Sequence, residues 1–292
     1  MTLNDWIRLA TLSLLWGGSF FFVELALVGL PVLTIVWCRV ALAAALLAGV
    51  LALRGMAFPG RGLWPAVLVM GLLNNAVPFT LFVLAQGHIT GAFAAILNAT
   101  TPLFTVIVAH LATRDERITG AKALGLAFGF AGVIVLLGRG VGGPSLAALM
   151  CLGAAVSYGL AGVFGRRFRR LGVAPLTSAF GQVAASTGLL LPVWLWLEPP
   201  WQLGWPGAVP VLAVLGLASL STALAYLIYF QLLGSAGATN LALVTFLVPV
   251  SATVLGLLFL GEALQPGQAV GFALIALGLV AIDGRVGRWI AR

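Results

Sequence analysis

The chain of 292 residues is 62% hydrophobic and 8% charged, with a formal net charge of +8 and a mean hydropathy of +1.14. An ordinary soluble domain has about 25% charged and about 45–50% apolar residues, so this composition excludes a globular protein with a water-exposed surface. The long apolar runs lack the alternation of barrel strands, and helices satisfy their own backbone hydrogen bonds in lipid. The sequence therefore predicts an all-α integral membrane protein.

Glycines, prolines and charge clusters divide the chain into about ten apolar segments, each close to the ~20 residues that a helix needs to cross a bilayer. The expected membrane spans, in chain order, are residues 6–28, 32–53, 63–85, 90–111, 120–138, 144–164, 174–197, 207–232, 237–260 and 267–283. The first apolar run is too long for the core of a signal peptide, so we expect no cleaved leader.

The basic residues are distributed unequally between the two sides of these spans. With a cytoplasmic N-terminus, every lysine and arginine except Arg39 and Arg139 lies in or beside a cytoplasmic segment. The positive-inside rule then predicts that both termini are cytoplasmic, in a multi-pass protein of the cell inner membrane. The run GRRFRR at residues 165–170 is interpreted as part of this signal, and no nucleic-acid partner is expected.

A weak internal repeat divides the chain. Its matched pairs, in chain order, are Trp16 with Tyr158, Asn75 with Thr222, Pro102 with Pro249 and Glu116 with Glu262. Each half holds five expected spans, an odd number, so the second copy must enter the membrane in the opposite orientation. We therefore expect two five-helix repeats of inverted topology, residues 1–140 and 141–292, around a central cavity. Many secondary transporters have this architecture, with the substrate site at the bilayer midplane between the repeats.

Polar and aromatic side chains share matching helical faces in the third and eighth expected spans. The first face holds Asn75, Phe79 and Phe82, and the second holds Thr222, Tyr226 and Tyr229. Residues at i, i+4 and i+7 lie on one side of a helix, and polar groups within a membrane usually face a cavity or another helix. We expect both faces to line a substrate cavity. The alternative is that the polar groups join helices, at about 0.6 kcal/mol each, and that the rings only pack.

The fourth and ninth spans each contain a proline with polar neighbours. Asn98 and Thr101 share a helical face around Pro102, whereas the ninth span keeps only Thr245 near Pro249. We add these three polar residues to the expected cavity lining. Each proline frees a backbone carbonyl at mid-depth, which suits a helix break at a binding site or a packing kink.

Arg39 is the only basic residue expected inside the membrane, where an unpartnered arginine costs about 2.5–3.5 kcal/mol on insertion scales. Glu24 lies at a similar expected depth in the first span, while Gln182 occupies the position that the repeat matches to Arg39. In one interpretation, Arg39 and Glu24 form a salt bridge that latches the first two helices together. In the other, Arg39 binds a substrate carboxylate or phosphate, with Glu24 as its resting partner or as a contact for a substrate ammonium.

The remaining chemistry-bearing residues predict structural roles. Glu116 and Glu262 begin the fifth and tenth spans, where carboxylates are expected to cap helix N-termini. Cys38 and Cys151 fall within spans without the spacing of metal ligands, so we expect neither a metal nor another cofactor. Two histidines at opposite interfaces, without an HExxH or GxSxG motif, argue against an intramembrane enzyme.

The segments LLWGGSFFFVE (residues 14–24) and PVLTIVWCRVALAA (residues 31–44) resemble the EamA-type transporters of the drug/metabolite transporter superfamily. In each half, a proline in the fourth span, a later glutamate and a closing glycine-rich span extend the resemblance along nearly the whole chain. The resemblance implies a ten-helix basket around a central cavity and the export of small metabolites, often amino acids. It places Trp16 and Arg39 near substrate, and we add Tyr158 as the repeat partner of Trp16.

We therefore expect a secondary transporter of the inner membrane that exports small metabolites, most of all amino acids, by alternating access. The alternatives are efflux of lipophilic drugs or cations, a membrane protein that does not transport, and an intramembrane enzyme. The expected partners are a small-molecule substrate and the lipid bilayer, and the sequence predicts no oligomeric state.

Overall fold

A computed structural model describes residues 1–113, 117–138 and 145–283. Within these residues every regular element is helical. Eight helical segments are long and apolar enough to cross a membrane, and Val244–Phe259 and Pro266–Ile282 are shorter apolar helices. The predicted all-α membrane class is therefore confirmed.

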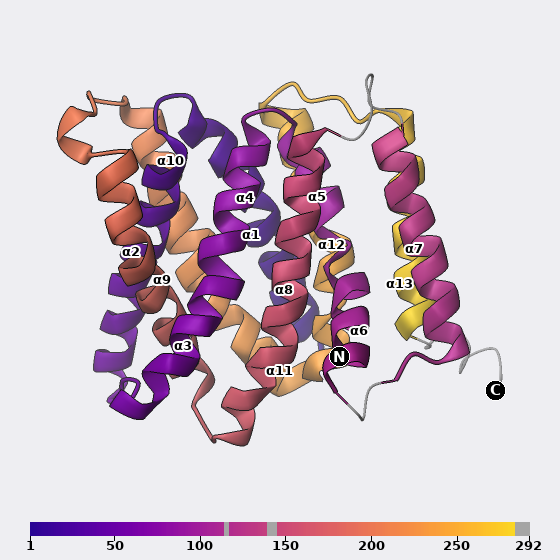
Figure 1. The fold of residues 1–292 in the computed structure, drawn as a ribbon, viewed down its shortest axis with the longest axis horizontal. Coiled ribbons are helices and arrows are strands. Elements are labelled where there is room, and N and C mark those ends of the chain that lie inside the picture. The colour runs from indigo at the N-terminus through magenta and orange to yellow at the C-terminus, as the bar shows by residue number, and fades with distance from the viewer. Residues whose placement is uncertain (114–116, 139–144, 284–292) are drawn as a thin grey trace.

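The helices stand side by side and connect alternately at two ends of the molecule (Figure 1). The first half contains α1 (Leu3–Leu27), α2 (Val32–Leu53), η1 (Arg61–Leu63), α3 (Trp64–Gly71), η2 (Leu72–Ala76), α4 (Val77–Gln86), α5 (Gly91–Asn98), α6 (Thr101–Ala112) and α7 (Gly120–Gly138). The second contains α8 (Leu146–Arg170), α9 (Pro175–Leu197), η3 (Pro200–Gln202), α10 (Ala208–Ala218), η4 (Ser219–Leu224), α11 (Ala225–Leu241), α12 (Val244–Phe259) and α13 (Pro266–Asp283). We call the end that holds Met1, at the bottom of Figure 1, the N-terminal face, and the other end the opposite face.

Several helices begin at side-chain caps that the sequence provides. At the start of α1, Asp5 N–H donates to Oγ1 of Thr2 at 3.2 Å, and Thr2 N–H donates to a carboxylate oxygen of Asp5 at 2.9 Å. Such reciprocal bonds satisfy two backbone donors that a helix start otherwise leaves free. Thr90 caps α5 and Ser145 caps α8 in the simpler form, with one side-chain oxygen each.

Three of the expected spans are interrupted within the described residues. The third contains the π-helical segment η2 between α3 and α4, and the eighth contains the π-helical η4 between α10 and α11. The fourth is divided into α5 and α6 by a turn at residues 99–100. These interruptions all occur near mid-span, where the sequence predicts polar side chains.

The two prolines behave differently from one another. Pro102 lies in the first turn of α6, where proline needs no hydrogen-bond partner, so it begins a helix after the break. Pro249 lies inside α12, which is helical on both sides of it, so this proline does not end a helix as Pro102 begins one. The ninth span also begins at Val244 instead of residue 237, because Gly237 has a φ of 78° and redirects the end of α11.

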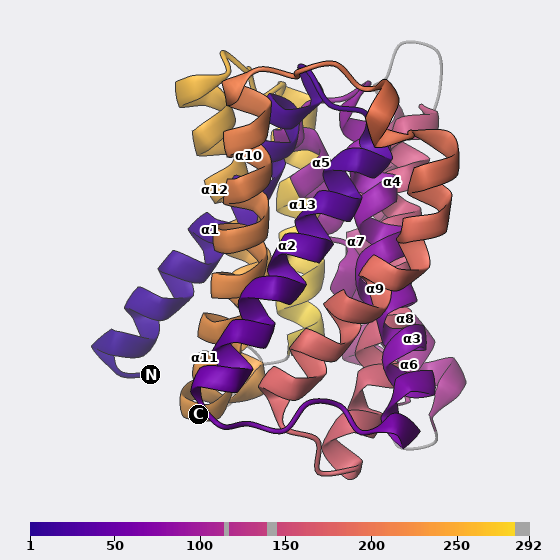
Figure 2. The same ribbon diagram turned by 90° about the vertical axis from the view of Figure 1, so that its left-hand side faces the viewer.

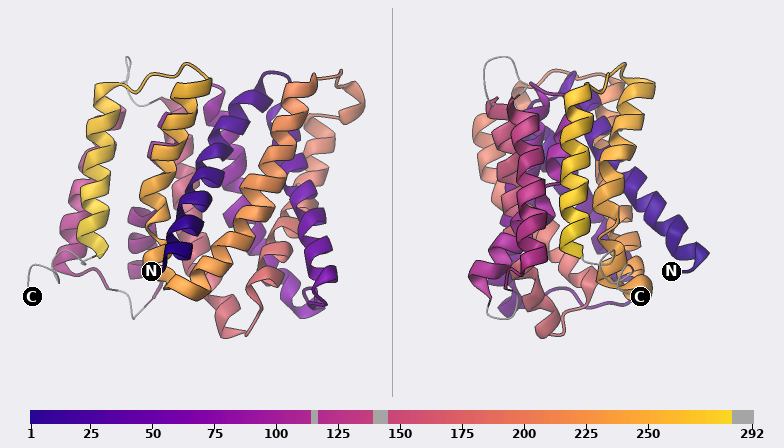
Figure 3. Two further views of the ribbon diagram at one scale, coloured as in Figure 1. Left: turned by 180° about the vertical axis from the view of Figure 1, so that it is seen from behind. Right: turned by 90° about the vertical axis from the view of Figure 1, so that its right-hand side faces the viewer.

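The pair of α7 and α13 stands at one side of the molecule (Figures 1 and 3). Glycines let the two backbones touch: a Cβ added to Gly125 would lie 2.5 Å from the carbonyl oxygen of Gly278, and one added to Gly132 would lie 2.6 Å from that of Gly271. Small residues allow this close approach of helices in a membrane. The last helix of the first half is therefore joined directly to the last helix of the second.

The other helices form the main bundle, with α2, α9 and α10 on the side that Figure 2 shows. Helix α1 runs through its middle and packs against α5, α10, α11 and α12. Helix α10 also packs against α2, whereas α1 and α2 make few contacts with each other. This arrangement directs one side of α2, and with it Arg39, into the interior of the bundle.

Candidate substrate site

Arg39 projects from α2 into the bundle, and only 6% of its surface is exposed. Its Nε donates a hydrogen bond to Oγ1 of Thr222 at 3.0 Å, and its Cζ lies 3.7 Å from the centroid of the Phe79 ring. The Thr222 hydroxyl in turn donates to the carbonyl oxygen of Leu217 at 2.8 Å. The two terminal guanidinium nitrogens form no hydrogen bond with any described residue, yet they are not sealed from solvent. Thr222 thus holds the Nε edge of the guanidinium and Phe79 covers one of its faces, while the two terminal nitrogens, which form a fork, remain available to bind a ligand.

Aromatic rings from four helices gather around this charge. Trp16 of α1 packs on Tyr229 of α11 with ring centroids 5.6 Å apart, and Phe82 of α4 packs on Tyr158 of α8 at 6.2 Å. The Tyr158 phenol lies within electrostatic range of the Arg39 guanidinium. Rings placed this way offer both apolar contact and a favourable surface for a substrate cation.

An amide network lies beside the rings. Nδ2 of Asn74 donates to Oε1 of Gln182 at 2.7 Å and to the Tyr226 hydroxyl at 3.3 Å, and Nδ2 of Asn75 donates to the same hydroxyl at 3.4 Å. The side-chain oxygen Oδ1 of Asn75 accepts no hydrogen bond from a described residue, although Asn75 is fully buried. A buried acceptor without a partner is costly and in native structures is often explained by function.

The polar residues of both halves lie on the two π-helical segments. Asn74 and Asn75 belong to η2, and Ser221 and Thr222 belong to η4, at positions that the internal repeat matches. The Ser221 hydroxyl is also buried, and it forms no hydrogen bond within the part of the chain that the structure describes. Single π-helical turns are rare and occur frequently at functional sites, so this pair of segments marks the same part of each half independently of residue type.

Most of the residues predicted from sequence come together in this site. They are Trp16, Arg39, Asn75, Phe79, Phe82, Tyr158, Thr222, Tyr226 and Tyr229, which hydrogen bonds, ring contacts and electrostatic proximity connect into one group. Three others make only local hydrogen bonds. Thr101 donates to Asn98 at 3.2 Å, and Thr245 donates to the carbonyl oxygen of Ala242 at 2.7 Å.

The suggested salt bridge between Arg39 and Glu24 does not form. Arg39 turns toward Thr222, whereas Oε1 of Glu24 lies beside Gly91, at the start of α5. Equal depth in neighbouring spans does not bring side chains together here, because α10 packs against both α1 and α2. Arg39 is therefore accommodated by a hydroxyl and an aromatic face, without a carboxylate.

Two carboxylates of the second half cap helices of the first half at the opposite face. Glu262 accepts hydrogen bonds from the backbone N–H groups of Gly91 and Ala92 at 3.1 and 3.2 Å, so it caps α5 and not α13, the helix expected from sequence. Glu198 accepts from the N–H groups of Leu33 and Thr34 at 3.0 and 2.7 Å and thereby caps α2. We call these two contacts the opposite-face caps. Glu116, the other predicted cap, lies outside the described residues.

The sequence interpretation missed several features of the structure. They are the contacts of Gln182, Asn74, Phe230 and Glu198, and the cap that Glu262 forms on α5. Asn74 and Gln182 carry the amide network, and Phe230 packs on both Tyr226 and Tyr229. The repeat provided one signal, since Gln182 is matched to Arg39. The caps gave none, because each joins residues more than a hundred positions apart.

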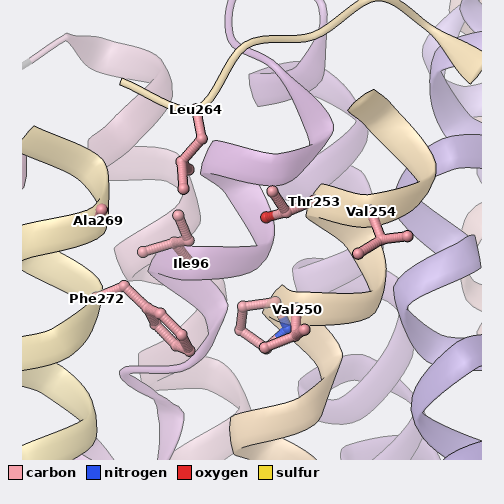
Figure 4. A pocket seen from close by; sticks show the side chains of 8 residues that line it. Ile96, Val250, Thr253, Val254, Leu264, Ala269 and Phe272 are labelled. Carbon is pink, nitrogen blue, oxygen red and sulfur yellow. The ribbon is translucent and has the colours of Figure 1, made fainter. Parts of the chain in front are cut away.

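Two cavities open elsewhere on the molecule. The first, of about 180 Å³, is an apolar crevice between α5, α12 and α13, with Ile96, Val250, Leu264 and Phe272 among the side chains around it (Figure 4). The second, of about 400 Å³, lies at the N-terminal face between the ends of α6 and α8 and is lined by Ala112, Thr113, Val163, Phe164, Arg166, Arg167 and Arg170. Neither of these two cavities is lined by Arg39.

The EamA-like transporter family matches the chain twice, over residues 6–138 and 145–282. The chain belongs to this family. The two matches cover nearly all the residues that the structure describes, and the boundary between them falls between α7 and α8.

Curated relatives of this EamA-family chain extend over most of its length. YvbV of Bacillus subtilis, named an uncharacterized transporter, is 28% identical over 95% of this chain and 90% of its own. YedA of Escherichia coli K12, named an uncharacterized inner membrane transporter, is 28% identical over 94% and 89%. PecM of Dickeya dadantii is 27% identical over 83% and 82%. A crystal structure of a protein superposes with a TM-score of 0.70 over the whole of both chains at 22% identity, which shows a shared fold.

In this EamA-family member, the site around Arg39 has the chemistry of a binding pocket. The free fork of Arg39 matches the two oxygens of a carboxylate or phosphate, which it would bind through parallel charge-assisted hydrogen bonds. The side-chain oxygen of Asn75 is an unused acceptor in the residue that donates to the Tyr226 hydroxyl. A molecule with a planar anion and a hydrogen-bond donor on a compact skeleton fits this set of groups.

Proposed function

We propose that this EamA-family protein is a secondary transporter of the inner membrane that exports small zwitterionic metabolites, amino acids first, by alternating access. The observation that carries the proposal is the buried Arg39, whose terminal nitrogens form no hydrogen bond with a described residue and lie among aromatic and amide side chains. The family match and the names of YvbV and YedA, the latter an inner membrane transporter, support membrane transport as the general activity.

The free-energy cost of burying the Arg39 guanidinium favours a substrate with a carboxylate. Burying a guanidinium without an acid is unfavourable, and a carboxylate that enters restores the electrostatic balance through two hydrogen bonds. Tyrosine hydroxyls and the Asn75 oxygen are then available to the substrate's ammonium, and the rings to its side chain. The positive charge of Arg39 disfavours a cationic drug in the same place, which ranks drug efflux second.

The architecture that we propose for transport is a pair of inverted five-helix repeats, residues 1–140 and 141–292, with the N-terminal face in the cytoplasm. The matched positions of the two π-helical segments and the double match to one family support the repeat. The opposite-face caps join the two halves on what is then the outer side. We infer that the structure represents a state closed to the outside.

Counterflow of labelled amino acids into proteoliposomes tests the proposal. We expect exchange of at least one of the twenty amino acids, and we expect Arg39→Ala to reduce that exchange about tenfold or more, because a lost charge-assisted hydrogen bond is worth about 1.5–3 kcal/mol. Arg54→Ala, which removes an exposed arginine at the end of the same helix, serves as the matched control. If no amino acid exchanges, the cargo is wrong, and efflux of a lipophilic cation that survives Arg39→Ala would favour the drug transporter.

A further inference from the structure

Two carboxylates meet at the first turn of α5, at the opposite face. Glu262 occupies the two free backbone donors there, those of Gly91 and Ala92. Glu24 reaches the same turn from α1, where its Oε1 would lie 3.4 Å from a Cβ added to Gly91. Glu24 and Glu262 are within electrostatic range of each other. The turn is therefore shared by one carboxylate that is bonded to it and one that is not.

The surroundings of Glu24 compensate its charge only in part. Its Oε1 is buried and forms no hydrogen bond with a described residue; the Gly91 N–H and the amide of Gln86 lie near the carboxylate and favour its charged form, but burial and Glu262 oppose that form more strongly. Gln86 is 6% exposed, donates from Nε2 to the carbonyl oxygen of Phe20 at 2.9 Å, and leaves its own Oε1 without a partner. No salt bridge joins either glutamate to a basic residue among those described, and the nearby His88 is exposed in the loop before α5.

A single negative charge suits this environment better than two. The partial positive charge at a helix N-terminus is about half an elementary charge, and Glu262 already uses it. A second carboxylate nearby adds repulsion and a desolvation cost, which the Gly91 N–H and the Gln86 amide offset only in part, and both costs are removed when one proton binds. The unused oxygens of Glu24 and Gln86 are the places where such a proton can be held.

We propose that Glu24 binds a proton taken from water at the opposite face, and that this proton holds the two halves together there. With the proton on Glu24, the pair carries one negative charge, and Glu262 remains on the N-terminus of α5. When Glu24 releases the proton to water, the two carboxylates repel each other and Glu262 leaves the helix end. Loss of this cap frees the α12–α13 connection from α5 and opens the opposite face.

Infrared titration of the full chain in lipid nanodiscs tests the proton site. The wild type is expected to show the C=O stretch of a protonated carboxyl that disappears as the pH rises, and Glu24→Gln to lack that band. Glu198→Gln is the matched control, because Glu198 also caps a helix, α2, at the same face. This control is expected to keep the band. A band of full size in Glu24→Gln would overturn the assignment of the proton to Glu24.

Spin labels test the link to opening. The labels are attached at His88→Cys in the first half and Gln265→Cys in the second, after replacement of Cys38 and Cys151 by alanine; both label positions are exposed. With native Glu24, the distance between them should lengthen as the pH rises. Glu24→Gln should keep the short distance at every pH, and Glu262→Gln, which weakens the cap itself, should show the longer distance throughout.

A distance that does not depend on pH with native Glu24, or one that still lengthens with pH in Glu24→Gln, would refute the link. Glu262→Gln also provides a second readout if Glu24→Gln fails to fold. Neither measurement uses a substrate, so a negative result is distinct from a failure of the proposed export of amino acids.

Discussion

At the residue scale, the central question is how Arg39 is tolerated inside the bundle. Its partners are the Thr222 hydroxyl and the face of Phe79. A cation over an aromatic face gains about 2 kcal/mol or more when both are desolvated, which is comparable to the cost of placing arginine in a membrane. The protein thus holds a guanidinium in place without neutralising it, and its charge remains available to a ligand.

Replacement of Arg39 by lysine separates binding from folding. We expect Arg39→Lys to melt within a few degrees of the wild type but to lose most amino-acid exchange, because a point charge cannot form the two parallel bonds of the guanidinium fork. Thermal unfolding and counterflow, measured on the same preparation, check this, with Arg54→Lys as the control. Equal losses of folded protein and exchange would instead make Arg39 a structural residue.

Removal of the Thr222 hydroxyl is a second test of the site at the residue scale. Thr222→Val keeps the shape of the side chain but removes the acceptor that orients Nε of Arg39. Leaving that donor unpaired costs about 1–3 kcal/mol, so we expect a lower melting temperature and weaker amino-acid binding. Thr187→Val, which removes a hydroxyl bonded only to the preceding turn of α9, is the control. A Thr222→Val protein with unchanged binding would show that Thr222 does not orient Arg39.

At the element scale, the close contact of α7 and α13 is the feature most sensitive to side-chain volume. The four glycines at this contact permit a backbone approach that no other residue allows. The same residues look like ordinary packing glycines in the sequence, because nothing there tells which helix they face. The contact between the two halves was therefore not predicted.

We expect Gly125→Ala and Gly278→Ala each to lower stability by about 1–3 kcal/mol, since the added methyl group would meet a backbone carbonyl of the partner helix. Gly188→Ala is the matched control, because nothing lies within 4 Å of its Cβ position in the middle of α9. This control should be neutral or more stable by up to about 1 kcal/mol. Thermal unfolding in nanodiscs measures both, and equal melting temperatures would contradict the close contact.

At the scale of the whole molecule, the sequence predicts best the positions and lengths of the apolar helices, which the thickness of the bilayer requires. Most of the expected spans coincide with helical segments, the start of the ninth being the main exception, because hydrocarbon thickness sets the length that an apolar helix needs. The breaks at η2, η4 and residues 99–100 were less predictable, since tertiary contacts select π-helical turns. The expected salt bridge between Glu24 and Arg39 does not form for a related reason. The sequence indicates the depth of each residue in the membrane, but the side to which each helix turns its residues depends on the packing of α10 against α1 and α2.

The orientation of the whole molecule gives a direct prediction. If the N-terminal face is cytoplasmic, a membrane-impermeant maleimide should label Trp201→Cys in intact cells and should label Arg61→Cys only after the membrane is permeabilised. Both positions are exposed, and they lie in connections at the two different ends of the molecule. The reverse pattern would invert the topology and with it the assignment of export.

The opposite-face caps are few, and this has a consequence for how easily that face can open. Glu198 and Glu262 each hold one helix end, and a cap is worth about 0.5–2 kcal/mol, so together they favour the shut form by about 4 kcal/mol at most. That free energy corresponds to about one molecule in a thousand in which both caps are broken. If the protein transports by alternating access as proposed above, we infer that breaking these two caps requires no more than thermal energy, so that the empty transporter can return between its two states without an energy source.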